Sequence, residues 1–391
     1  MDFSIYLSPI NIPDYNIHGS NYEKRIGDLL RIHTSESGFP DLEDIHIAIF
    51  GVNESRLSVN NKGTEKAADA VRNYFYQLYP INSKIKVADL GNIKCGNDIE
   101  DTYFAVKTIA ENLMKQKIIP VIIGGSQDIT YANYLAYENM GQIINITSID
   151  SSFDLGNAEE NFNSQSYLSK IILHQPNFLF NFTNIGYQTY FVNQEAIQLM
   201  RSLYFDVYRL GHIRSNMEDV EPLVRNADLV SFDISSIRQS EAPGNANASP
   251  NGFDGEEACK IARYAGLSDK LTSFGIYEIN PEFDQNGHTA HLAAQIIWYF
   301  IDGVYQRKGD FPHKQKKDYL KYIVGMEDNE HEIVFYKSKR SGRWWMQVPL
   351  NNPMQGKYER HFMVPCSFKD YETANNNEIP DRWWQVYQKL M

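Results

Sequence analysis

The stretch IINITSIDSSFD (residues 143–154) decides the fold, because in it an apolar run ends at two carboxylates, Asp150 and Asp154, four positions apart. The stretches VIIGGSQD (121–128) and LVSFDIS (229–235) repeat this form. Short continuous apolar runs of this kind are typical of buried strands in a parallel sheet. We therefore expect the polar groups that follow them to lie at one edge of that sheet, where ligands bind to such folds.

Strand and helix patterns alternate on both sides of these stretches. Helical spacing of apolar residues occurs at 64–78, 101–116, 129–139 and 288–305. Eight apolar runs read as strands: 45–52, 86–90, 118–123, 143–149, 178–186, 207–210, 229–233 and 271–277. This alternation predicts an α/β fold with three α/β/α layers and a mostly parallel sheet of about eight strands.

The composition changes near residue 309. Residues 307–321 carry six Lys or Arg side chains against two Asp, a pattern typical of a solvated linker. Beyond them, residues 332–337 and 343–348 flank the turn sequence SKRSG, which indicates a hairpin, and PDRWW at 380–384 opens a terminal helix. We predict an N-terminal segment at 1–44, the α/β domain at 45–309 and a C-terminal appendage at 310–391.

Charge and cysteine content limit the function classes. The formal charge of −12 disfavours nucleic acid and anionic membranes as partners, which attract basic surfaces. No run approaches the 18 apolar residues that a transmembrane helix needs, and no leader pattern opens the chain, so we expect a cytoplasmic protein without a membrane span. The three cysteines form no CxxC motif, which disfavours a thiolate zinc site.

Four motifs, in order along the chain, resemble the arginase, agmatinase and formimidoylglutamase family of ureohydrolases. They are GGSQD (124–128), DSSFD (150–154), SFDIS (231–235) followed by APG, and YEINP (277–281). The formimidoylglutamase branch is the most similar, because the acidic Asp128 follows Gln127, which stands at the family's first metal-ligand position. The resemblance covers residues 45–305 and implies an arginase-like α/β/α domain, two manganese ions, and trimers or hexamers as homo-oligomers.

The resemblance implies six metal ligands, of which three are kept and three are replaced. The kept positions are Asp150, Asp154 and Asp233; the lost positions are Gln127 and Ser152, in place of histidines, and Ser235, in place of an aspartate. Carboxylate and amide oxygens suit a hard cation. We therefore expect the three aspartates and Gln127 to form a single degenerate site that holds no ion or one Mn²⁺, Mg²⁺ or Ca²⁺, and we do not expect a binuclear manganese centre.

Three carboxylates at one edge repel one another when no cation is present. We expect one of them to be protonated or paired with Lys or Arg in that state. Glu278 survives at the family position that orients a guanidinium or amidine group, and no residue is assigned as catalytic. A carboxylate at the end of a strand also occurs without any such role.

These departures favour an inactive pseudoenzyme that acts as a binding or scaffold protein for a small amidine or guanidine ligand. The alternative is a metal-dependent hydrolase of formimidoylglutamate, agmatine or a related C–N bond. A zinc deacetylase on a related sheet is disfavoured, since it needs a histidine near Ser152. Aromatic and Arg residues of the appendage suit either a protein partner or packing against the main domain: Trp344, Trp345, Trp383, Trp384, Arg343 and Arg382.

Overall fold

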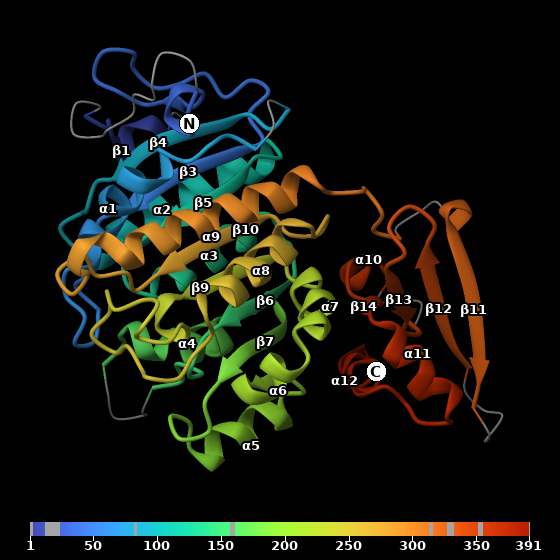
Figure 1. Ribbon diagram of the computed structural model, residues 1–391. Coiled ribbons are helices and arrows are strands. Elements are labelled where there is room, and N and C mark those ends of the chain that lie inside the picture. The colour runs from blue at the N-terminus through green and yellow to red at the C-terminus, as the bar shows by residue number, and fades with distance from the viewer. Residues whose placement is uncertain are drawn as a thin grey trace.

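The computed structural model describes residues 3–11, 24–81, 84–156, 161–312, 316–326, 332–350 and 355–390. Two layers of helices enclose a large central sheet, and a smaller unit stands beside them at the C-terminal end of the chain (Figure 1). The predicted α/β/α architecture with a C-terminal appendage is confirmed.

The central sheet contains ten strands in the described residues, where about eight were predicted. Nine follow the order β1-β4-β3-β5-β10-β9-β6-β7-β8, and β2 pairs with β4 outside this path. Only β1 runs antiparallel to its neighbour. The strands are β1 (Leu7–Ser8), β2 (Arg31–Ile32), β3 (Ile47–Val52), β4 (Val87–Ile93), β5 (Ile119–Ile123), β6 (Ile144–Ile149), β7 (Leu179–Tyr187), β8 (Asp206–Arg209), β9 (Leu229–Asp233) and β10 (Ser273–Tyr277). The additional β1 and β2 have two residues each, too few for a hydrophobic period to show.

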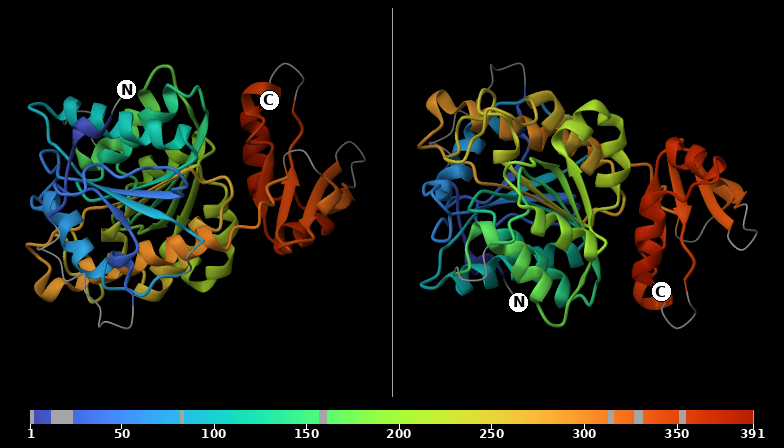
Figure 2. Two further views of the ribbon diagram at one scale, coloured as in Figure 1. Left: turned by 90° about the horizontal axis from the view of Figure 1, so that it is seen from above. Right: turned by 90° about the horizontal axis from the view of Figure 1, so that it is seen from below.

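Helices cover both faces of this sheet (Figure 2). One layer contains α1 (Ala67–Phe75), α6 (Leu210–Ser215), α7 (Val220–Arg225), α8 (Gly255–Gly266) and α9 (His288–Tyr305). The other contains α2 (Ile99–Lys115), α3 (Ile129–Glu138), α4 (Tyr167–Leu173) and α5 (Gln194–Ser202). Every residue of β5, β6, β9 and β10 is buried, which explains why these strands read as continuous apolar runs.

Short 3-10 helices complete the main part of the chain. They span Phe3–Tyr6, Ile26–Asp28, Thr64–Lys66, Ser164–Ser166, Met217–Asp219, Ile234–Ser236 and Gln285–Gly287, and one more, Lys316–Asp318, precedes the appendage sheet. Within the described ranges, no helix combines the length and apolarity that crossing a bilayer requires.

The appendage is a four-stranded antiparallel sheet with helices packed on it. Its strands follow the order β11-β12-β13-β14. They are β11 (Tyr319–Gly325), β12 (Glu332–Ser338), β13 (Trp344–Gln347) and β14 (Met363–Cys366), with helices α10 (Gln355–Tyr358), α11 (Phe368–Asn375) and α12 (Asp381–Leu390). Trp344, Trp345 and Trp383 are buried, whereas Trp384 is 45% exposed. Most of these tryptophans thus serve packing, and a protein partner of the appendage stays a prediction.

The appendage packs against the ends of the central strands that lie opposite their carboxyl ends. The ring of His361 stacks on Phe180, at the start of β7, with 4.3 Å between ring centroids. Arg225 of α7 donates to the carbonyl of Trp344, and its guanidinium lies 4.3 Å from the ring centroid of Trp345. The carboxyl edge of the sheet is therefore left free of the appendage.

Substitution of Arg360, in the appendage, tests how much this junction contributes to stability. Its Nη2 donates to Oδ1 of the fully buried Asp228 over 2.7 Å, and Lys270 Nζ lies 3.4 Å from the other oxygen. Burial raises the pKa of Asp228, but the positive charges of Lys270 and Arg360 help to lower it by more than burial raises it, so the net shift is downward. We expect Arg360→Met to lower the free energy of unfolding by about 1 kcal/mol, because Lys270 remains as a counter-charge. Urea unfolding at neutral pH measures this change.

Arg340→Met is the matched control, since Arg340 pairs with Asp318 on the exposed surface of the same appendage. Exposed pairs contribute little to stability. Equal effects of the two substitutions would contradict the assigned role of Arg360.

Candidate metal and ligand site

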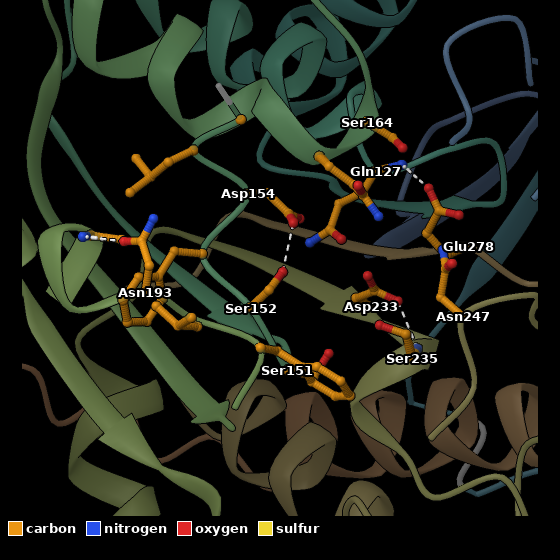
Figure 3. A pocket seen from close by; sticks show the side chains of 17 residues that line it. Gln127, Ser151, Ser152, Asp154, Ser164, Asn193, Asp233, Ser235, Asn247 and Glu278 are labelled. Atoms are coloured by element: carbon orange, nitrogen blue, oxygen red, sulfur yellow. Dashed lines mark hydrogen bonds between the residues drawn. The ribbon is translucent and has the colours of Figure 1, made fainter. Parts of the chain in front are cut away.

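The predicted site residues meet at the carboxyl edge of the sheet because β5, β10, β9 and β6 are neighbours in that order. Gln127 follows β5, Glu278 follows β10, Asp233 ends β9, and Asp150 and Asp154 follow β6. All of them except Asp150 line a cavity of about 510 Å³ (Figure 3). The structure thus brings together side chains that are up to about 150 residues apart, as the strand-end rule predicts.

Asp150, Asp154 and Asp233 form a compact carboxylate triad. One oxygen from each lies within 4.8 Å of those from the others, and all three side chains are buried. Burial, reinforced by the charges of Asp150 and Asp233, raises the pKa of Asp154 well above its ordinary value. Burial also raises the pKa of Asp150 and that of Asp233. No Lys, Arg or His is among the described residues that line the cavity beside Asp154 and Asp233.

Gln127 lies beside the triad with an unused acceptor. Its Nε2 lies 3.3 Å from Asp150 Oδ2 and contacts several hydroxyls at 3.4 Å. Its Oε1 is buried and has no hydrogen-bond donor among the described residues. A buried acceptor without a donor costs free energy, so it needs a partner that the protein itself does not supply. Three carboxylates and this amide oxygen together fit a hard divalent cation such as Mn²⁺.

Ser152 and Ser235 are held against the same carboxylates. Ser152 Oγ donates to Asp154 Oδ1 over 2.6 Å, and its backbone N–H donates to Asp150 Oδ1 over 2.9 Å. The backbone N–H of Ser235 donates to Asp233 Oδ1 over 2.6 Å. One oxygen of each aspartate is therefore engaged by the protein itself.

Glu278 forms the other acidic wall of the cavity. Its Oε1 accepts from the backbone N–H of Gln127 over 2.9 Å, and its Oε2 accepts from Asn61 Nδ2 over 2.7 Å. Burial raises its pKa to about 7. Its backbone has φ of 64°, and that of Asp154 has φ of 49°, conformations that cost energy in residues other than glycine and concentrate at functional sites.

Asn61 and Asn245 hold this strained backbone, and no sequence pattern indicates either residue. Both donate from their side-chain amides to the carbonyl of Glu278, over 2.9 and 2.7 Å. Asn61 also accepts from the backbone N–H of Ala246 over 3.0 Å. Both residues lie in loops without a periodic pattern, and only the folded chain brings Asn61 to a glutamate 217 positions away.

A sequence model of the Arginase family matches residues 45–302, which include all of these site residues. The chain belongs to the arginase family. The resemblance predicted from the four motifs is thereby confirmed, and residues 310–391 lie outside the matched region.

Relatives of this arginase-family chain carry the name formimidoylglutamase. That of Streptococcus gordonii is 23% identical over 318 residues, covering 73% of this chain and 95% of the relative. That of Staphylococcus haemolyticus is 28% identical over 262 residues, covering 62% of this chain and 81% of the relative. The similarity to the formimidoylglutamase branch thus extends beyond the four motifs.

Solved structures show the same fold. Trypanosoma cruzi formiminoglutamase with Mn²⁺₂ matches with a TM-score of 0.66 and 19% identity, covering 73% of this chain and all of that one. Formimidoylglutamase from Bacillus subtilis matches with a TM-score of 0.66 and 18% identity, covering 74% of this chain and 95% of that one. Agmatine ureohydrolase from Thermoplasma volcanium matches with a TM-score of 0.59 and 20% identity, over 72% and 94%.

The manganese pair in the Trypanosoma cruzi structures corrects one prediction. The sequence predicts no ion or one divalent ion and disfavours a binuclear manganese centre; against these structural neighbours that expectation is wrong. It counted the positions of Gln127, Ser152 and Ser235 as lost ligands. All three aspartates remain in one cluster, and the side-chain amide of Gln127 lies beside Asp150 with an oxygen to which no described residue donates.

Proposed function

We propose that this arginase-family protein has a degraded manganese site and binds a small amidine or guanidine ligand in the cavity without hydrolysing it. The pair of serines carries this proposal. Ser152 and Ser235 stand at positions where the family motifs have a histidine and an aspartate, and both hydrogen-bond to triad aspartates. Neither hydroxyl supplies the charge or basicity of the residue type that it replaces.

No histidine is among the described residues that line the cavity. Its titratable side chains, among the described lining residues, are Asp154, Asp233 and Glu278 only. General acid–base catalysis most often uses histidine. Manganese held by the triad and the Gln127 amide oxygen would supply Lewis acidity and lower the pKa of water. Glu278, fixed by Asn61 and the Gln127 N–H, would accept hydrogen bonds from the ligand's N–H groups.

A metal-dependent hydrolase of formimidoylglutamate, agmatine or a related compound is the second candidate. Glu278 favours it, because a buried carboxyl group with a pKa of about 7 suits a general base at neutral pH. The intact triad favours it as well. The two candidates differ in one respect, which is turnover.

Assays of the full chain with excess Mn²⁺ separate the candidates. We expect release of formamide, urea or ammonia from formimidoylglutamate, agmatine and arginine to stay at background, while the Streptococcus gordonii relative, assayed in parallel, serves as the positive control. The triple variant Q127H/S152H/S235D, which restores the family's ligand types, is expected to gain Mn²⁺-dependent turnover. Turnover by the unaltered chain that Asp233→Ala abolishes would refute the binding proposal in favour of the hydrolase.

A further inference from the structure

We propose that the ligand of this cavity joins its cationic head to an apolar body, and that Phe191, Val192 and Leu155 select that body. This inference rests on the proposed binding function. It specifies the class of ligand as an alkyl-substituted amidine or guanidine whose far end carries no carboxylate.

The cavity has two chemically different ends. Asp154, Asp233 and Glu278 lie together, and Asn193 lies away from Glu278 at the opposite end (Figure 3). The segment that contains Asn193 also contributes Phe191 and Val192 to the lining. Leu155 and Ala196 are the further aliphatic lining residues. A ligand that extends from the acidic end past this segment therefore contacts carboxyl groups at one end and apolar side chains at the other.

Phe191 is 50% exposed, and its neighbour Tyr190 is 64% exposed. The two rings pack edge to face with 4.8 Å between centroids. Tyr190 OH donates to Gln188 Oε1, and Gln188 Nε2 donates to the carbonyl of Asn251 over 3.1 Å. Adjacent exposed aromatic side chains that are anchored in this way are typical of a binding surface.

Polar residues at the cavity rim are already used by the protein. Asn193 Oδ1 accepts from the backbone N–H of Ala196 over 2.7 Å, where it caps α5. Ser164 Oγ accepts from the backbone N–H of Val59 over 3.3 Å, and Asn247 Nδ2 donates to the carbonyl of Val59 over 3.4 Å. These contacts tie loops together, and none of these rim residues carries a positive charge for a ligand's anionic end.

A carboxylate on the ligand would also meet the wrong charges. No Lys, Arg or His lies among the described lining residues, whereas three carboxyl groups do. An anionic end would lose its hydration without gaining a counter-charge. An apolar end gains instead, because each methylene buried against Phe191 and its neighbours tightens binding by roughly fourfold.

Calorimetric titration of the Mn²⁺-saturated full chain tests the selection. The probes share a guanidinium head: ethylguanidine, n-butylguanidine, agmatine and arginine. We expect n-butylguanidine to bind most tightly and arginine most weakly, with roughly fourfold tightening per methylene from ethyl to butyl. Phe191→Ala should reduce that increment to less than about twofold per methylene. Phe104→Ala is the matched control, since Phe104 is 54% exposed on α2 and does not line the cavity.

The outcomes distinguish this inference from the function on which it rests. The proposed selection by Phe191, Val192 and Leu155 is wrong if agmatine or arginine binds as tightly as n-butylguanidine. It is also wrong if Phe191→Ala leaves the gain in affinity per methylene unchanged. In both cases the proposed binding function still stands. If the folded chain binds none of the four guanidines, the proposed binding function is wrong, and so is the selection by Phe191, Val192 and Leu155. Glu278→Gln, which removes the carboxylate at the head end, should weaken all four probes by a similar factor.

Discussion

Replacing Arg72 by methionine is expected to lower the free energy of unfolding by about 3–5 kcal/mol, the cost typical of breaking a buried ion pair from one side. Arg72 and Asp89 are both fully buried. Two parallel hydrogen bonds of 2.9 Å join the guanidinium to the two carboxylate oxygens. Without Arg72, Asp89 keeps hydrogen bonds from Tyr76 OH and the Gly91 N–H but loses its counter-charge. Urea unfolding of the full chain measures the loss.

Two further variants identify the cause of the effect. The double variant R72M/D89N removes the stranded charge and should recover a substantial part of the loss. The matched control is Lys66→Met, which breaks an exposed pair with Glu282 and should leave the unfolding midpoint unchanged. If R72M/D89N is no more stable than R72M alone, the buried-charge explanation is wrong.

Much of the carboxyl edge could be predicted from residue order alone. Gln127, Asp150, Asp154, Asp233 and Glu278 each follow an apolar run, and parallel strands bring their carboxyl ends to one side. The order β5-β10-β9-β6 could not be predicted in the same way, because β10 lies between strands that are distant in sequence. That order is what makes the triad compact.

Other features depend on contacts that no local pattern encodes. Asn61 reaches Glu278 from a loop, and its role follows from two hydrogen bonds that exist only in the folded chain. The position in which the appendage packs on the main domain depends on buried charges such as that of Asp228. In the sequence, Asp228 is an ordinary polar residue before β9. The metal prediction rested on replaced ligand positions alone, and the structural neighbour that holds two manganese ions contradicts it.

Manganese is expected to offset the loss of stability that the triad causes at high pH. In the metal-free chain, burial raises the pKa of Asp154 and of Asp233 well above the ordinary 3.8. The folded state then binds more protons than the unfolded state, so stability present at low pH is lost as pH rises through the raised pKa values. We expect thermal unfolding of the metal-free chain to occur at lower temperature at pH 8 than at pH 5. Mn²⁺ at 100 times its dissociation constant should add about 2.7 kcal/mol at pH 8.

Asp154→Asn should separate the repulsion among the carboxylates from the stabilisation by Mn²⁺. It removes one of three mutually repelling carboxylates, and asparagine tolerates the φ of 49° at this position. We therefore expect the metal-free variant to be more stable than the unaltered chain at pH 8, by about 0.5–2 kcal/mol, and to gain nothing from Mn²⁺. Asp228→Asn is the control: that aspartate is equally buried but faces Lys270 and Arg360, so its loss should destabilise the chain. A metal-free Asp154→Asn variant that is less stable than the unaltered chain would show that the triad is not held under repulsion, and would remove the main physical reason for placing a cation there.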